Sequence, residues 1–281
     1  MPPLDRVWIW YLVSMLLAVG LYGFGPGPAH HRPGLYVAIA STMLAVQLLL
    51  ARRPNAWFAR GAYAAIGLPI VYSSVGLVLP HLHPEPYEFT FIAIDRALFG
   101  CDPTVALAPW LQPWSTELLY WCYASFYFLP VIVVLWTAKR HGVAKFAPAL
   151  TLVVFSFLWS YLFYVLLPAR GPQLYFPRGA PPQGLWLASD LDRWILVAEA
   201  NKWDLFPSGH TWVTLVTLVL AWRHVRPCFW LLLPVGALLI VATMALNLHF
   251  VIDVLAGAVM AAVTLLVGDR LVRSGPEPQT I

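Results

Sequence analysis

The stretch Pro207-Ser208-Gly209-His210, taken together with His249 and Asp253, decides the fold of this chain. Two apolar runs, residues 211–222 and 229–246, lie between the histidines and are separated by a short basic turn. At ~1.5 Å per helical residue, two crossings of a ~30 Å bilayer core need roughly 40 residues, which is the spacing between the histidines. Both histidines are therefore predicted at one membrane surface, and Asp253, one helical turn after His249, shares its helix face.

The composition is that of an integral membrane protein. The 281 residues are 60% hydrophobic and 11% charged, against roughly 25% charged residues in a soluble domain. The net charge of +4 does not indicate nucleic-acid binding, because the basic residues sit in short turns between apolar runs. The three cysteines have no metal-ligand spacing, so we expect neither a metal nor a cofactor.

Eight apolar segments predict an all-α fold, a polytopic membrane helix bundle of about eight transmembrane helices in one integral membrane domain, residues 1–281. The predicted segments are Val7–Phe24, Gly34–Leu50, Gly61–Leu79, Ser115–Thr137, Phe146–Pro168, Ser208–Trp222, Pro227–Leu246 and Phe250–Val267. With a cytoplasmic N-terminus, 11 of the 17 lysines and arginines fall on the inner side. We therefore expect a bacterial-type plasma membrane protein with both termini in the cytoplasm and an extracytoplasmic active site.

The Pro-Ser-Gly-His stretch has the features of an anion site. It opens a helix, where free backbone N–H groups and the positive end of the helix dipole favour a negative group. Proline suits a helix start, Ser208 can cap it, and Gly209 lets a ligand approach the backbone. A phosphate there would lie beside His210, and an ordinary capped helix start is the alternative.

His249 and Asp253 form the second part of the predicted site. A carboxylate one turn along the helix can fix the imidazole tautomer and stabilise its positive charge. Ionisable groups within a span are costly and mark function. A structural His–Asp pair is the alternative, but the position of this pair on the side of His210 favours chemistry.

These two motifs carry a family resemblance. The Pro-Ser-Gly-His stretch followed by residues 249–257 resembles the second and third signature motifs of the type 2 phosphatidic acid phosphatase superfamily. The resemblance is nearest to the branch of inositol phosphorylceramide synthases and sphingomyelin synthase-like transferases. It covers residues 115–267, as a catalytic core, and leaves residues 1–80 as additional N-terminal spans. Two family cations are missing, since Phe163 stands in place of a lysine and Thr243 in place of an arginine.

The resemblance implies a membrane phosphoesterase or phosphotransferase that acts on a lipid phosphate without a metal. His249 would attack phosphorus to form a phosphohistidine, with Asp253 holding its ring. His210 would protonate the leaving alkoxide and then activate water or an alcohol. The phosphate oxygens would be bound by Ser208, the Gly209 backbone and Arg170.

Four further residues are weaker candidates for substrate binding. Lys202 and Arg178 lie in the loop expected to cap the site, where a solvated charge is the alternative. Tyr164 and Asn247 are candidate hydrogen-bond partners of a substrate, with packing as the alternative.

The expected partners are a lipid phosphate, an alcohol acceptor such as inositol, and membrane lipids, but no nucleic acid. Because a phosphodiester carries less negative charge than a monoester, the missing cations favour phosphotransfer or an atypical phosphatase. Two other classes stay open: a transporter that uses the histidines and Asp253 as a proton relay, and an inactive phosphatase-like scaffold.

Overall fold

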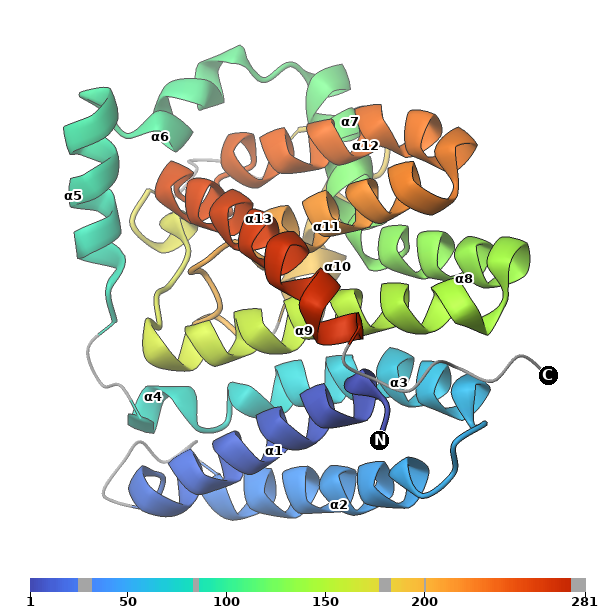
Figure 1. The fold of residues 1–281 in the computed structure, drawn as a ribbon. Helices are drawn as coiled ribbons and strands as arrows, with labels where there is room; N and C mark the ends of the chain where they lie inside the picture. Colours follow the sequence, from blue (N-terminus) through green and yellow to red (C-terminus); the bar gives the residue numbers. More distant parts are fainter. Residues whose placement is uncertain (25–31, 83–85, 177–182, 200, 274–281) are drawn as a thin grey trace.

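The computed structural model describes residues 1–24, 32–82, 86–176, 183–199 and 201–273, and within these ranges the chain forms helices and no strand (Figure 1). The α-helices are α1 Pro3–Tyr22, α2 Pro33–Ala51, α3 Trp57–Val75, α4 Leu79–Leu82, α5 Glu88–Phe99, α6 Pro103–Leu107, α7 Pro113–Ala124, α8 Leu129–His141, α9 Val143–Leu166, α10 Ala188–Ala198, α11 Gly209–His224, α12 Arg226–Ala245 and α13 Val251–Arg273. Short 3-10 turns lie at Ala108–Trp110, Ser125–Tyr127 and Pro172–Leu174. The predicted all-α class is confirmed.

The number of apolar spans is smaller than the number of predicted segments. Five of the described helices, α1, α2, α9, α12 and α13, are long and apolar enough to cross a membrane. The predicted segments at α3 and α11 are helical but do not meet the same requirement, since α11 has only 16 residues and the 19-residue α3 is less apolar. The bundle is therefore polytopic, with five or six long apolar spans in the described part of the chain.

The sixth span would be a bent one. The single segment predicted at Ser115–Thr137 is two helices, α7 and α8, that meet at 51° across the 3-10 turn Ser125–Tyr127. Pro130, in the first turn of α8, explains the break, because proline has no N–H to continue the ladder and its ring clashes with the preceding turn.

Helices α1, α2 and α3 form an N-terminal layer that lies against α9 (Figure 1). A buried ion pair holds this layer together: Arg60 in α3 donates through Nε and Nη2 to the two carboxylate oxygens of Asp5 in α1, both at 2.8 Å. Gln47 in α2 donates to the same carboxylate at 2.8 Å. The Arg60 and Asp5 side chains are only 1% and 0% exposed, so each depends on the other for its charge balance.

The start of α10, between α9 and α11, is fixed through Glu117 in α7. Its carboxylate accepts hydrogen bonds of 3.0 to 3.2 Å from the backbone amides of residues 185–188, at the start of α10. A carboxylate in this place satisfies the free N–H groups and complements the helix dipole. Helix α10 is thereby held so that its far end, Glu199, reaches the site described below.

Replacing Asp5 by Ala should lower the free energy of unfolding by roughly 3–5 kcal/mol, because Arg60 is left buried without its counter-charge. Asp102→Ala is the matched control, since Asp102 pairs with Arg96 at the same 2.8 Å but that arginine is 55% exposed. The control should cost at most about 1 kcal/mol. Thermal unfolding of the purified proteins in one detergent measures both, and equal losses would show that the buried pair contributes no more than the exposed one.

Candidate active site

The two histidines of the predicted site meet. His210 lies in the first turn of α11 and His249 in the turn between α12 and α13. Nδ1 of His210 and Nε2 of His249 are 3.4 Å apart, and the ring centroids 5.5 Å apart. His249 is only 4% exposed. The nitrogens are at hydrogen-bond distance, so a phosphate that reached both of them would have to part the rings.

The His249 turn is fixed by two carboxylates. Asp253 accepts the backbone N–H of Phe250 at 2.8 Å, and its Oδ2 lies 3.5 Å from Nδ1 of His249. Asp95 in α5 accepts the amides of Val251 and Ile252 at 2.8 and 2.9 Å, which caps α13. Asp253 therefore faces the side of the His249 ring that is turned away from His210.

Glu199 is a member of the site that the sequence did not reveal. Its Oε1 lies 3.2 Å from Nε2 of His210 and accepts hydrogen bonds from the hydroxyls of Tyr123 at 2.6 Å and Tyr127 at 3.3 Å. Burial raises the pKa of Glu199, but the contacts with His210 and Tyr123 outweigh this and leave the pKa below its ordinary value. An ionised Glu199 stabilises positive charge on the His210 ring. No motif spacing links Glu199 to either histidine, since α10 and a loop deliver it.

Asp204 is a second carboxylate that the sequence did not single out. Tyr72 in α3 donates to its Oδ2 at 2.5 Å, and its backbone forms an isolated parallel bridge with Ala169. Removal from bulk water and the charge of Glu199 raise the pKa of Asp204 to about 7. The N-terminal helices thus contribute a side chain to the surroundings of the site.

Arg170 is engaged in an ion pair rather than free for a ligand. Its Nη2 lies 2.7 Å from Oε1 of Glu88, whose side chain is fully buried at the start of α5. The same guanidinium donates to the Tyr175 hydroxyl at 2.7 Å and lies over the Trp203 ring at 5.6 Å. Its role as a phosphate ligand therefore stays a prediction. That role requires Arg170 either to break its ion pair with Glu88 or to bind Glu88 and the phosphate at the same time.

The other residues of the Pro-Ser-Gly-His stretch are placed as a helix start. The Ser208 hydroxyl accepts the Thr211 N–H at 3.3 Å, as expected of an N-cap. A Cβ at position 209 would lie 2.5 Å from the Tyr164 hydroxyl, so only glycine fits this close approach. Tyr164 is therefore next to the predicted phosphate-binding backbone.

The remaining candidates point elsewhere. Asn247 donates to the Phe176 carbonyl at 2.8 Å, and Lys202 to the Leu196 carbonyl at 3.1 Å at the end of α10. Arg178 lies outside the described residues. At the two positions without the family cations, Phe163 packs edge-on against Trp212, and the Thr243 carbonyl accepts the His249 amide at 2.8 Å.

The described surroundings of the two histidines are acidic. The carboxylates of Glu199, Asp204 and Asp253 lie around them, whereas Arg170 is paired with Glu88. Burial and the charge of His210 lower the pKa of His249 to about 3, so its ring is neutral near neutral pH. Neutral His249 has a ring nitrogen with a free electron pair that can attack an electrophile, and Nε2 of His210 lies 3.2 Å from the Glu199 carboxylate.

Residues 89–267 match the PAP2 superfamily, and the chain belongs to this superfamily. Its members act as phosphatases and phosphotransferases on lipid phosphates, so the coarse class is a membrane-embedded, phosphatase-like lipid phosphoesterase. The match begins before the region covered by the sequence motifs and includes α5 and α6. No curated protein and no solved structure is significantly similar to the chain.

The raised pKa of Asp204 predicts a pH-dependent effect of Asp204→Asn on stability. Between about pH 4 and pH 7 the folded protein holds a proton that an unfolded aspartate has released, so this group makes the wild type less stable as the pH rises. Asparagine does not titrate in this range, and its side-chain oxygen still accepts a hydrogen bond from the Tyr72 hydroxyl. The melting temperature of Asp204→Asn relative to wild type should therefore rise by a few degrees from about pH 5 to about pH 8.

Asp190→Asn is the control for this titration, because Asp190 is an exposed aspartate whose partner Arg193 is also exposed. Its melting temperature relative to wild type should change little over the same range. A pH-independent difference for Asp204→Asn would show that Asp204 is ionised throughout.

Proposed function

We propose that this protein cleaves a lipid phosphate ester through a phosphohistidine on His249, at the extracytoplasmic face of the membrane. The observation that carries the proposal is the pair of facing ring nitrogens 3.4 Å apart, each ring having a carboxylate on its other side. The orientation is supported by the distribution of lysines and arginines along the chain.

In the first step, Nε2 of His249 attacks phosphorus and the bond from phosphorus to the alcohol oxygen breaks. The proton on Nδ1 of His210 passes to the departing oxygen, so no free alkoxide forms. The Nδ1–H of His249 faces Asp253, whose charge stabilises the ring when it becomes phosphorylated. The Ser208 hydroxyl, the Gly209 backbone and Arg170 are the proposed ligands of the phosphate oxygens.

In the second step, water or an alcohol attacks phosphorus and the phosphorus–nitrogen bond breaks. His210 takes the proton of the attacking group, and His249 returns to its neutral form. Glu199 acts in both steps by stabilising the positive charge of His210 from its Nε2 side. Tyr123 and Tyr127 are positioning residues, because their hydroxyls hold that carboxylate.

We also propose that a phosphodiester is a better substrate than a phosphomonoester. The described site has Glu199 beside His210 and Asp253 beside His249, and its arginine is already paired with Glu88. A monoester dianion would meet more repulsion there than a singly charged diester. This favours transfer of the phosphorus-containing group from His249 to an alcohol, such as inositol, over release of free phosphate.

Replacing His249 by Ala should abolish turnover of a labelled lipid phosphate and abolish the acid-labile label on the protein, because no nucleophile is left. Asp253→Asn should lower kcat by at least ~10²-fold. Asp190→Asn should retain activity, because Asp190 is an exposed carboxylate at the end of α10 opposite to Glu199. Melting temperatures establish that each variant is folded, and label on folded His249→Ala would contradict the covalent mechanism.

A panel of labelled lipids tests the substrate. The purified protein is incubated with phosphatidic acid or with a phosphodiester lipid, each with and without inositol, and free phosphate is resolved from new lipid. We expect a higher kcat/KM for the diester and an inositol-dependent new lipid. Faster release of phosphate from phosphatidic acid would overturn the substrate preference and leave the phosphohistidine proposal in place.

Vanadate separates the enzyme from the two other classes, a proton-relay transporter and an inactive scaffold. An enzyme of this kind should bind vanadate in a manner lost in His249→Ala, because vanadate adopts the geometry of the attacked phosphorus. Binding that is unchanged in His249→Ala would remove the argument for a phosphoryl-transfer site.

A further inference from the structure

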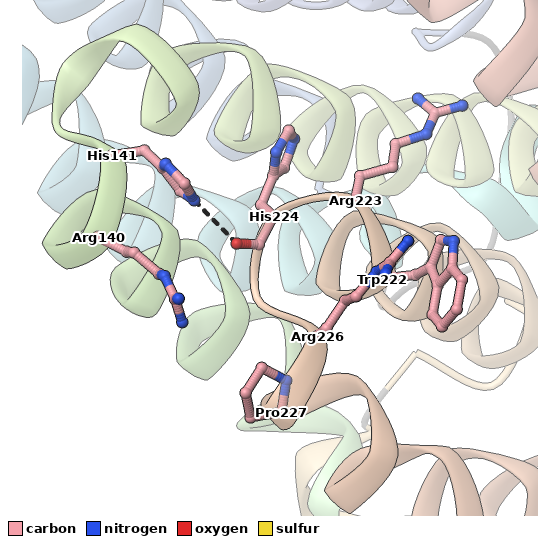
Figure 2. Close-up of a pocket in the computed structure, with 7 residues that line it drawn as sticks. All are labelled: Arg140, His141, Trp222, Arg223, His224, Arg226 and Pro227. Atoms are coloured by element: carbon pink, nitrogen blue, oxygen red, sulfur yellow. Dashed lines mark hydrogen bonds between the residues drawn. The ribbon is translucent and has the colours of Figure 1, made fainter.

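A second charged site lies at the end of α11 opposite to His210. From His210 to His224 the helix rises by about 21 Å, so the two ends face different regions of the molecule. A cavity of about 520 Å³ opens there, lined by Arg140, His141, Trp222, Arg223, His224, Arg226 and Pro227 (Figure 2). We refer to it as the basic pocket. Its volume is in the range of small-molecule sites.

The basic pocket concentrates positive charge from three helices. Arg140 lies in the last turn of α8, Arg223 lies in the last turn of α11, and Arg226 begins α12. Figure 2 shows Arg140 and Arg226 on two sides of the turn that joins α11 to α12. Among the residues that the structure describes, the seven that line the pocket include no Asp or Glu. A group with negative charge would therefore meet attraction from several directions.

The walls of the basic pocket are held in place by contacts that leave the two guanidinium groups accessible. Nε2 of His141 lies 2.8 Å from the backbone carbonyl of His224, which ties the end of α8 to the end of α11 (Figure 2). The guanidinium of Arg226 lies over the Trp222 ring at 4.4 Å. Arg140 and Arg226 are both exposed. The site is thus arranged before any ligand arrives.

Exposed aromatic side chains beside the basic pocket support a position at the level of lipid headgroups. Trp222 contacts Phe229 at 5.0 Å and Trp230 at 5.9 Å between ring centroids. Trp222 and Trp230 are 40% and 62% exposed. Tryptophan and arginine at the ends of apolar helices mark the membrane–water interface. Phosphate groups of phospholipids occupy that level, whereas free anions reach it only from the aqueous side.

We propose that the basic pocket binds the phosphate of an anionic phospholipid headgroup, with Arg140 and Arg226 as its principal ligands. Arginine suits this role because its planar fork donates two parallel hydrogen bonds to a phosphate. Trp222 would contact the glycerol or the start of the acyl chains. The site is separate from the proposed catalytic centre, and the inference does not depend on the proposed function.

The test is binding of phosphatidylglycerol to the delipidated full-length protein, with phosphatidylcholine as the neutral lipid, followed by native mass spectrometry and by melting temperature. Phosphatidylglycerol should bind more tightly than phosphatidylcholine. Each of Arg140→Ala and Arg226→Ala should weaken phosphatidylglycerol binding by about fivefold and leave phosphatidylcholine binding unchanged. Repeating the series in His249→Ala excludes turnover at the catalytic centre.

Arg52→Ala is the matched control, because Arg52 is also an exposed arginine on the predicted inner side but does not line the basic pocket. If Arg52→Ala weakens binding as much as the pocket variants, the arginines attract lipid only as scattered surface charge, and the proposal is wrong. Inorganic phosphate is added in a separate arm. Displacement of phosphatidylglycerol by phosphate at comparable concentration would overturn the assignment to a lipid.

Discussion

Buried charge has to be balanced, and in this protein the balance is made around His210 and His249. Each ring has a carboxylate on the side turned away from the other ring, at 3.2 Å for Glu199 and 3.5 Å for Asp253. Removing one member of such a set leaves another buried and uncompensated, which costs several kcal/mol. The parts of the fold that deliver these four side chains are therefore bound to one another.

Two of these carboxylates are themselves held by other parts of the chain. Asp253 accepts a hydrogen bond from the Phe250 amide at the start of α13, and Glu199 accepts hydrogen bonds from the hydroxyls of Tyr123 in α7 and Tyr127 in the following 3-10 turn. The bend between α7 and α8 matters here, because Tyr123 lies at the end of α7 and Tyr127 lies in the 3-10 turn that forms the bend. Helix α10 brings Glu199 to them and is fixed at its other end by Glu117. Helix α10 is thus held at both ends by polar contacts.

The acidic surroundings give the site a different electrostatic character from one built to hold a phosphate dianion. The two positions where the family has a lysine and an arginine carry Phe163, packed on Trp212, and Thr243, which accepts a backbone amide. Arg170 is neutralised by Glu88. The proposed singly charged substrate and a neutral His249 are compatible with this balance. The N-terminal helices lie outside the residues that match the superfamily, but they take part in this balance through Tyr72, whose hydroxyl donates to Asp204.

The sequence by itself determined the helical class, the approximate positions of the long apolar helices and the meeting of His210 with His249, because helix rise and bilayer thickness relate distance along the chain to position across a membrane. The Ser208 cap followed from the same local rules. Only the tertiary structure decided that Glu199 and Asp204 join the site and that Arg170 is taken by Glu88. Those contacts join residues from loops and from helices far apart in sequence, and no helical period or motif spacing encodes which loop residue will face a given side chain.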